Sequence, residues 1–405
     1  MTEPAQSTVE ENAPVASKQA LVLSGGNVKG AYQAGAIAEI LQCEHFRPTA
    51  IYGISVGSIN GGMLASYLGE QFLDPLQKAA APNFAAAGLR VEKFWKDNIH
   101  RFEDIAASKS ILRIAWDVFR HDFRGILDVD ASIDIIRREI NPKHVLEASR
   151  RGIQFFPGTL NLTTGNYFDA SPDSEPPVKD YDYHDVCDYV IASSMAPLVM
   201  PLWAIPSDAH KGKSAVKRWL ENRKERRAAK KKADHEDRDD SWLDGGIYYP
   251  APISSAIEDG YDDIICVLTR PTTIGRGSFR GRLGKIGERI SDVVAQKLLD
   301  VDEKWANDMQ AWIDFLETKV ELSKAEFAEF KKTPFGNYRS FQLKPIRPDK
   351  EIPFKIETLE DGQVEEMAKW GRDDARVVMR DYKRHVPKPY AKASADPVDP
   401  PEAPI

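Results

Sequence analysis

Short apolar runs alternate with helix-forming segments along most of this chain. The runs that predict buried strands are 19–24, 48–55, 154–162 and 262–270. The segments that predict helices are 30–42, 56–70 and 130–140. Parallel strands need a crossover connection, commonly a helix. The β-α-β order therefore predicts a mostly parallel sheet with helices on both faces, which is a three-layer α/β/α fold.

One later stretch has a helical rather than an alternating pattern. Between residues 285 and 330 apolar side chains recur at helical spacing, at Ile286, Ile290, Val294, Leu298, Val301, Trp305, Met309, Trp312 and Leu316. This is the pattern of an amphipathic helix that packs its apolar face on a core. We expect two helices here, lying against the sheet.

Both ends of the chain have the composition of disordered tails. Residues 1–18 are rich in Glu, Pro, Ser and Ala, and residues 386–405 are rich in Pro. Between them we expect one domain, 19–385, which carries a charged insertion at about 208–240 and the helical segment at about 285–330. The sequence shows no internal repeat.

Composition narrows the class of protein. The 405 residues carry a formal net charge of -7, and the three cysteines lie far apart without a C-x-x-C pair. That spacing argues against a zinc site or a disulfide framework and fits a reducing compartment. The first residues are polar and acidic, unlike a signal peptide, and no apolar run approaches about 20 residues. We expect a cytoplasmic protein without a metal.

A serine stands in a turn suited to a nucleophile. Gly53 to Gly57 read G-x-S-x-G, with Ser55 at the centre, between a predicted strand and a predicted helix. Glycine beside the serine permits the sharp turn, and the following helix directs its positive dipole end at the reacting group. The alternative is an ordinary strand-to-helix turn, because Gly and Ser are common there.

A second glycine-rich turn, "SGGNVKG" at 24–30, also ends a strand and opens a helix. Its backbone N–H groups can converge on an anion. A Walker A loop would need Gly-Lys-Ser/Thr, but Lys29 comes before the last glycine. A dinucleotide fingerprint would need an acidic residue at the end of the next strand, but that strand ends in Ser55. An oxyanion hole beside Ser55 explains both turns, while a phosphate- or nucleotide-binding module is the alternative.

The base for such a serine is not an obvious histidine. The eight histidines occur in no triad-like pattern. Asp244, in "SWLDGG", follows a short apolar strand and is the more suggestive partner, although a plain Asp-Gly turn is the competing interpretation.

Four blocks in this order resemble the patatin-like phospholipase family. They are "LSGGNVKGAYQAG" from Leu23, "GISVGS" from Gly53, "ASSMAPLVMP" from Ala192 and "LDGGIYYPAPI" from Leu243. Weaker similarity, in "TLNLTTGNYF" and "GRDDARVVM", extends the resemblance over about residues 19 to 380.

The resemblance implies a Ser-Asp dyad without histidine, in which Ser55 is the nucleophile and Asp244 its partner. It implies an oxyanion hole at Gly25, Gly26 and Asn27. The other residues that it marks are Gly53 and Gly57 in the nucleophile turn, and Lys29, Gly30, Gly245 and Gly246 in supporting positions. Asn27 replaces the third consecutive glycine of the family pattern, and Asn tolerates left-handed backbone better than other non-glycine residues.

By the same resemblance, the protein is a lipid acyl hydrolase of the phospholipase A or lysophospholipase type that needs no cofactor. Acyl transfer on the same scaffold is an alternative. The apolar run that begins at Met195 is either an acyl-binding cleft or a buried strand and turn. Lys211–Lys232 holds eleven Lys and Arg against two Glu. It is either a peripheral contact with anionic membrane or a solvated insertion, and the lack of interleaved aromatics argues against nucleic acid.

Overall fold

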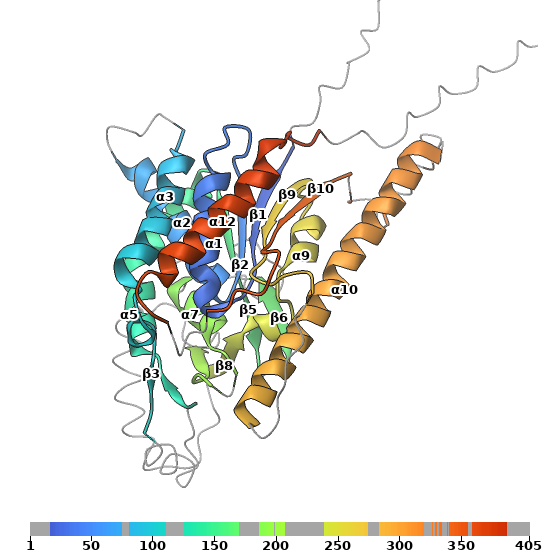
Figure 1. The fold of residues 1–405 in the computed structure, drawn as a ribbon. Helices are drawn as coiled ribbons and strands as arrows, with labels where there is room; N and C mark the ends of the chain where they lie inside the picture. Colours follow the sequence, from blue (N-terminus) through green and yellow to red (C-terminus); the bar gives the residue numbers. More distant parts are fainter. Residues whose placement is uncertain are drawn as a thin grey trace, which may run out of the picture.

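A central sheet crosses the molecule between two layers of helices (Figure 1). The computed structural model describes residues 17–74, 81–110, 125–169, 186–197, 199–206, 239–273, 283–319, 326, 329, 332–333, 338, 340–354 and 359–386. The strands of the sheet are β1 (Gln19–Leu23), β2 (Ala50–Ile54), β5 (Gln154–Asn161), β6 (Asn166–Asp169), β7 (Trp203–Pro206), β8 (Asp239–Asp244), β9 (Asp263–Val267) and β10 (Gln342–Ile346).

The sheet is mixed, with its parallel part in the middle. Its order is β10-β9-β1-β2-β5-β8-β7, and β6 pairs with β5. The five strands from β10 to β5 are parallel, whereas β8 and β6 run antiparallel to β5, and β7 runs antiparallel to β8. The predicted strands are confirmed, as is a three-layer α/β/α fold with mostly parallel strands. A small hairpin of β3 (Ala107–Ser108) and β4 (Leu127–Asp128) stands apart from this sheet.

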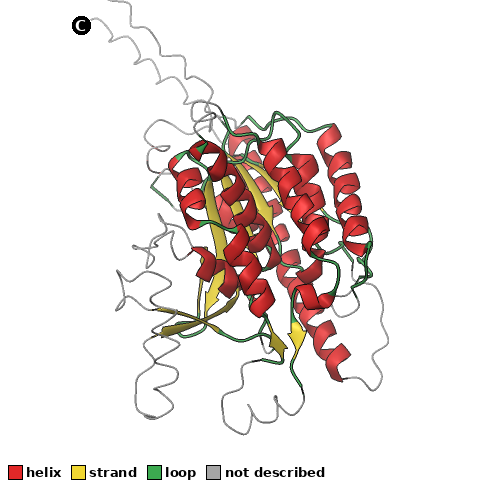
Figure 2. Ribbon diagram, turned by 90° about the vertical axis from the view of Figure 1, so that its left-hand side faces the viewer, coloured by secondary structure: helices red, strands yellow, loops and turns green. Residues whose placement is uncertain are grey.

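Helices cover both faces of the sheet (Figure 2). The described helices are α1 (Gly30–Ile40), α2 (Val56–Leu73), α3 (Phe84–Asn98), α5 (Asp130–Glu139), α6 (Pro142–Arg150), α7 (Val186–Ser194), α9 (Ile253–Glu258), α10 (Leu283–Lys319) and α12 (Gln363–Arg380). Three short 3₁₀ turns are η1 (Asn27–Lys29), η2 (Phe102–Asp104) and η6 (Gly245–Ile247). Residues of β1 alternate between two cores. Leu21 and Leu23 pack with α1, α2 and α3, while Ala20 and Val22 pack on the side of α9 and α10.

Helix α12 completes the first layer by docking directly on α1 (Figure 1). Both helices place a glycine at the contact. A Cβ on Gly35 would overlap the carbonyl of Ala368, and a Cβ on Gly371 would overlap the carbonyl of Tyr32. These two glycines allow the backbones to touch, so segments more than 300 residues apart in the chain share one core.

The helical pattern predicted between residues 285 and 330 is confirmed where the structure describes it, since residues 326 and 329 beyond α10 are helical too; the division of this segment into two helices stays a prediction. Leu283–Lys319 forms the single helix α10, of 37 residues. The sequence holds no proline over this range and no glycine after Gly287, so nothing in it breaks the backbone hydrogen bonds. The basic segment 211–232, and most of both predicted tails (1–16 and 387–405), lie outside the described residues.

Candidate active site

Ser55 sits in a strained turn between β2 and α2. Its φ of 54° and ψ of −124° lie in a region that costs a non-glycine residue about 1–3 kcal/mol. The flanking glycines make the turn sterically feasible. A Cβ on Gly53 would overlap the carbonyl of Gly57, and a Cβ on Gly57 would overlap the carbonyl of Leu23. Ser55 is 7% exposed. This is the geometry of a nucleophile elbow.

A buried serine from α7 holds the turn in place. The N–H of Ser55 donates to Ser193 Oγ at 2.9 Å, and Ser193 Oγ donates to the carbonyl of Gly158 in β5 at 2.6 Å. Ser58 Oγ lies 2.8 Å from Ser193 Oγ and donates to the carbonyl of Gly53 at 2.7 Å. Sequence reasoning quoted Ser193 within the third block but gave it no role. Its position next to Ser55 depends on how α7 packs on β5.

Asp244 comes from β8, which is separated from β2 in the sheet by β5. It ends β8, where it pairs in register with Thr159 of β5, and its N–H donates to the carbonyl of Met195 at 3.1 Å. The carboxylate accepts the N–H of Gly246 at 2.7 Å, and the Ser55 side chain lies near enough to lower its pKa. The two residues that the sequence singled out, 189 positions apart, thus lie next to each other.

Burial governs the ionisation of Asp244. Loss of solvent raises the pKa of this carboxyl to about 6, while the hydrogen bond from the Gly246 N–H and the nearby Ser55 side chain oppose the rise. At neutral pH the group is therefore mostly ionised. It is also a stronger base than an ordinary aspartate, which makes it better suited to accept a proton from a hydroxyl.

The glycine-rich loop lies beside Ser55. The position of a Cβ on Gly25 is 3.3 Å from the Ser55 Cβ, so only glycine leaves room for a reacting group between them. The N–H of Gly25 is occupied, because it donates to the carbonyl of Pro250 at 3.0 Å. Within the described residues, no acceptor takes the N–H of Gly26 or of Asn27. These two groups are free to bind an anion.

The conformation of this loop depends on its two neighbours. A Cβ on Gly26 would overlap the side chain of Thr269, which follows β9. Asn27 has a φ of 53°, in the left-handed region that Asn tolerates. Asn27, which replaces a glycine of the family pattern, therefore stands at a position with positive φ. Asn is one of the few non-glycine residues that adopt this conformation readily.

A buried chain of amides fixes the loop from behind. Gln33 Nε2 donates to the carbonyl of Ser24 at 2.7 Å, and Asn60 Nδ2 donates to Gln33 Oε1 at 3.1 Å and to the carbonyl of Gly30 at 3.0 Å. Trp95 Nε1 then donates to Asn60 Oδ1 at 2.7 Å. Sequence reasoning missed this chain, since single polar residues inside apolar helices give no motif.

The remaining predicted positions are structural in this geometry. A Cβ on Gly30 would overlap the side chains of Val56 and Trp95, and a Cβ on Gly245 would approach the carbonyl of Gly158. Gly246 contributes the N–H that Asp244 accepts. Lys29 ends η1 just before α1, and its side chain is half-buried.

An apolar cavity of about 70 Å³ opens next to Ser55, enclosed by α2, α3, α5 and the loop after α7. Its apolar lining includes Val56, Ile59, Trp95, Val129, Met195 and Met200. Met195 and Met200 belong to the apolar run whose sequence fits either an acyl-binding cleft or a buried strand and turn. They line the cavity, and the strand β7 starts after them. A larger, more polar cavity of about 1000 Å³ lies beside β6 and α9 and does not include Ser55.

Residues 21–257, more than half of the chain, match the model of the patatin-like phospholipase family. The chain belongs to this family. Membership in the patatin-like phospholipases makes it a hydrolase that acts on lipids, and the resemblance noted from the four blocks is confirmed. The matched range includes both Ser55 and Asp244, whereas α10 and α12 lie beyond it.

Among solved structures, the chain is similar to VipD from Legionella pneumophila. The identity is 13% and the TM-score 0.35, over 90% of this chain and 67% of that one. No curated protein matches the chain. In the part that the structure describes, no helix combines the length and apolar character needed to span a membrane.

Proposed function

We propose that this protein hydrolyses carboxylic esters of lipids through a Ser55–Asp244 dyad and an acyl-enzyme intermediate. The observation that carries the proposal is the placement of the Ser55 elbow beside the buried carboxylate of Asp244, whose pKa burial raises to about 6. A serine hydroxyl needs an adjacent base to become a nucleophile, and Asp244 is such a base without the intervention of histidine.

In the first half of the reaction, Ser55 Oγ attacks the ester carbonyl and its proton passes to Asp244. The negative charge then develops on the former carbonyl oxygen. The unoccupied N–H groups of Gly26 and Asn27 are the donors that we assign to this oxygen, since the N–H of Gly25 is bound to Pro250. Gly25 contributes by its lack of a side chain. Loss of one such donor typically costs about 100- to 1,000-fold in rate.

In the second half, Asp244 gives its proton to the departing alcohol, which leaves the acyl group on Ser55. Water then attacks this ester while Asp244 takes its proton, and the free carboxylic acid departs as Ser55 is restored. The apolar cavity beside Ser55 supports a substrate with an acyl chain, because its walls are Val, Ile, Trp and Met side chains that favour apolar groups.

The test is fatty-acid release from a phospholipid, together with labelling by a fluorophosphonate. Ser55→Ala should abolish labelling, and both Ser55→Ala and Asp244→Asn should lower turnover by at least about 1,000-fold, as removal of a nucleophile or its base does. The matched controls are Ser66→Ala, which is buried in α2, and Asp240→Asn, which is half-buried in β8. Both variants should remain active. Undiminished turnover in either dyad variant would refute the proposal.

A further inference from the structure

Three large apolar side chains are exposed together on two neighbouring loops. They are Ile126, 41% exposed, just before β4, and Val199 and Leu202, 37% and 48% exposed, between α7 and β7. The loops are joined by backbone hydrogen bonds, since the N–H groups of Ile126 and Leu127 both donate to the carbonyl of Val199, at 2.9 and 3.0 Å. We call these three residues the apolar rim.

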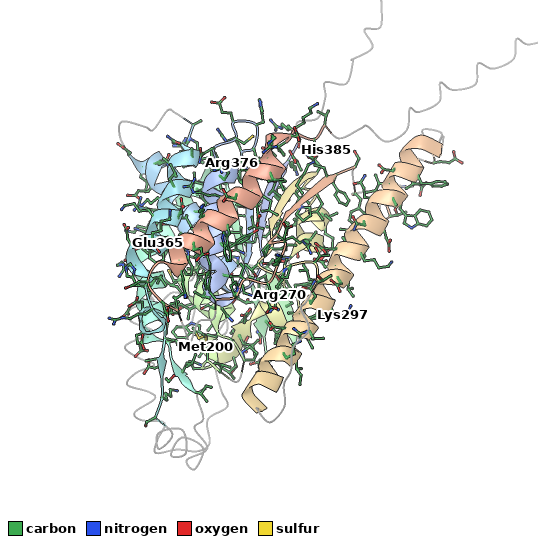
Figure 3. All side chains as sticks on the ribbon, in the orientation of Figure 1. Met200, Arg270, Lys297, Glu365, Arg376 and His385 are labelled. Carbon is green, nitrogen blue, oxygen red and sulfur yellow. The ribbon has the colours of Figure 1, made fainter. Side chains whose placement is uncertain are left out.

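The apolar rim adjoins the cavity beside Ser55. Met200, between Val199 and Leu202, lines the cavity that contains Ser55. Figure 3 labels Met200 in the lower left part of the molecule in that view. Gly125 packs against the same segment, because a Cβ on it would lie 2.7 Å from the Val199 and Met200 backbone. The apolar lining of the cavity and the apolar rim are thus continuous through one short loop.

The chemistry of the rim fits the surface of a lipid aggregate. A single exposed apolar residue is ordinary, but a group of them next to a binding cavity marks an interaction site. An acyl chain that moves from a bilayer to the Ser55 cavity would pass from the apolar rim to Met200 and the mostly apolar lining of the cavity. Lys109 stands at the same place, with its Nζ donating to the carbonyl of Gly125 at 3.1 Å. Its charge suits the phosphate level of a lipid surface.

We propose that Ile126, Val199 and Leu202 insert into the surface of a phospholipid bilayer and place the entrance of the Ser55 cavity against it. The proposal rests on the proposed lipid hydrolysis, and it assigns the docking of substrate to described loops rather than to the basic segment 211–232. Insertion of apolar side chains depends on buried apolar area, so it survives high salt.

The test uses the full chain with Ser55→Ala, which prevents hydrolysis, and vesicles of phosphatidylcholine in a sedimentation assay. The parent should bind, and addition of Val199→Asp with Leu202→Asp should weaken the partition coefficient at least about tenfold, since a charge is excluded from hydrocarbon. The matched control is Val377→Asp, an exposed valine on α12 next to Arg376, which Figure 3 places towards the opposite end of the view. Its binding should equal that of the parent.

Several outcomes would overturn the docking site. These are a parent that does not bind, equal binding by the double Asp variant and the parent, or equal weakening by Val377→Asp. Loss of parent binding in about 1 M NaCl, where the Debye length is about 3 Å, would assign binding to charge instead. A dimeric parent that the double Asp variant makes monomeric would assign the rim to a second copy of the chain. Far-UV circular dichroism must show that the variants are folded.

Failure of the proposed ester hydrolysis can be distinguished from failure of the proposed docking to a bilayer. In the wild-type background, the double Asp variant should lower the ratio of activity on vesicles to activity on a soluble short-chain ester, while Val377→Asp keeps that ratio. If the wild type hydrolyses no ester, the Ser55–Asp244 proposal fails. Rim-dependent binding to vesicles would still establish the docking surface.

Discussion

The backbone N–H of Ser55 is held by the hydroxyl of Ser193, 138 residues further along the chain, at 2.9 Å. The same hydroxyl donates to the carbonyl of Gly158, so the nucleophile turn is tied through α7 to β5. Ser193 is fully buried and does not face the cavity. We therefore regard it as a positioning residue that maintains the positive φ of Ser55.

Ser193→Ala should lower kcat about 10- to 100-fold with little change in KM, because a shift of about 1 Å in a reacting group can cost this much. It should also destabilise the fold by about 1–3 kcal/mol, the cost of an unpaired buried N–H. The second-order rate of fluorophosphonate labelling should fall in parallel with kcat.

Ser66→Ala is the control for this prediction. Ser66 is equally buried and accepts the N–H of Asn141 at 3.1 Å. It lies further along α2, away from the elbow at the start of that helix. Its loss should cost similar stability without the drop in kcat. If both variants lose kcat to the same extent, Ser193 acts only through general stability.

The reaction should depend on pH through Asp244. Its pKa is about 6, and only the ionised carboxylate accepts a proton from Ser55. On a soluble ester, kcat/KM should be constant above about pH 7 and fall about tenfold per unit below about pH 6. Circular dichroism at each pH separates this decline from unfolding. A rate that stays constant down to about pH 4 would mean that the base is another group.

The backbone at Asn27 predicts a simple order of tolerance. Glycine adopts a φ of 53° without strain, so Asn27→Gly should keep most of the activity. Asn27→Val places a β-branched residue in the left-handed region and should lower kcat about 100-fold by displacing an oxyanion donor. Steady-state kinetics and thermal unfolding of both variants check this. Equal activity of the two would show that the loop conformation at Asn27 is unimportant.

Much of the fold, and the two residues of the proposed dyad, could be picked out from the sequence because the signals are local. The strand at 19–24 and the helix after it are set by a short apolar run and its neighbours, and Ser55 and Asp244 each stand in a short glycine motif. Two glycine-rich turns at the ends of adjacent parallel strands, β1 and β2, were expected to meet, and they do.

The remaining features depend on long-range packing. That the N–H of Gly25 is used by Pro250 follows from the pairing of β1 with β9 and from the chain's path after Asp244, which no local pattern encodes. The antiparallel direction of β8 is equally invisible in its six residues. The length of α10 is different, because its uninterrupted amphipathic pattern is visible in the sequence from residue 285 onward.

The buried carboxylate of Asp244 also has a consequence for the stability of the whole protein. Its pKa in the folded state is about 6, against 3.8 for the exposed group. Between about pH 4 and pH 6 the folded state therefore binds more protons than the unfolded state, and stability falls as pH rises through this window. Above it, the ionised group destabilises the fold by about 3 kcal/mol, at 1.36 kcal/mol for each pKa unit. A chain selected for stability alone would not keep a carboxylate here, so at neutral pH the reactive state of the site is maintained at the expense of the fold that holds it.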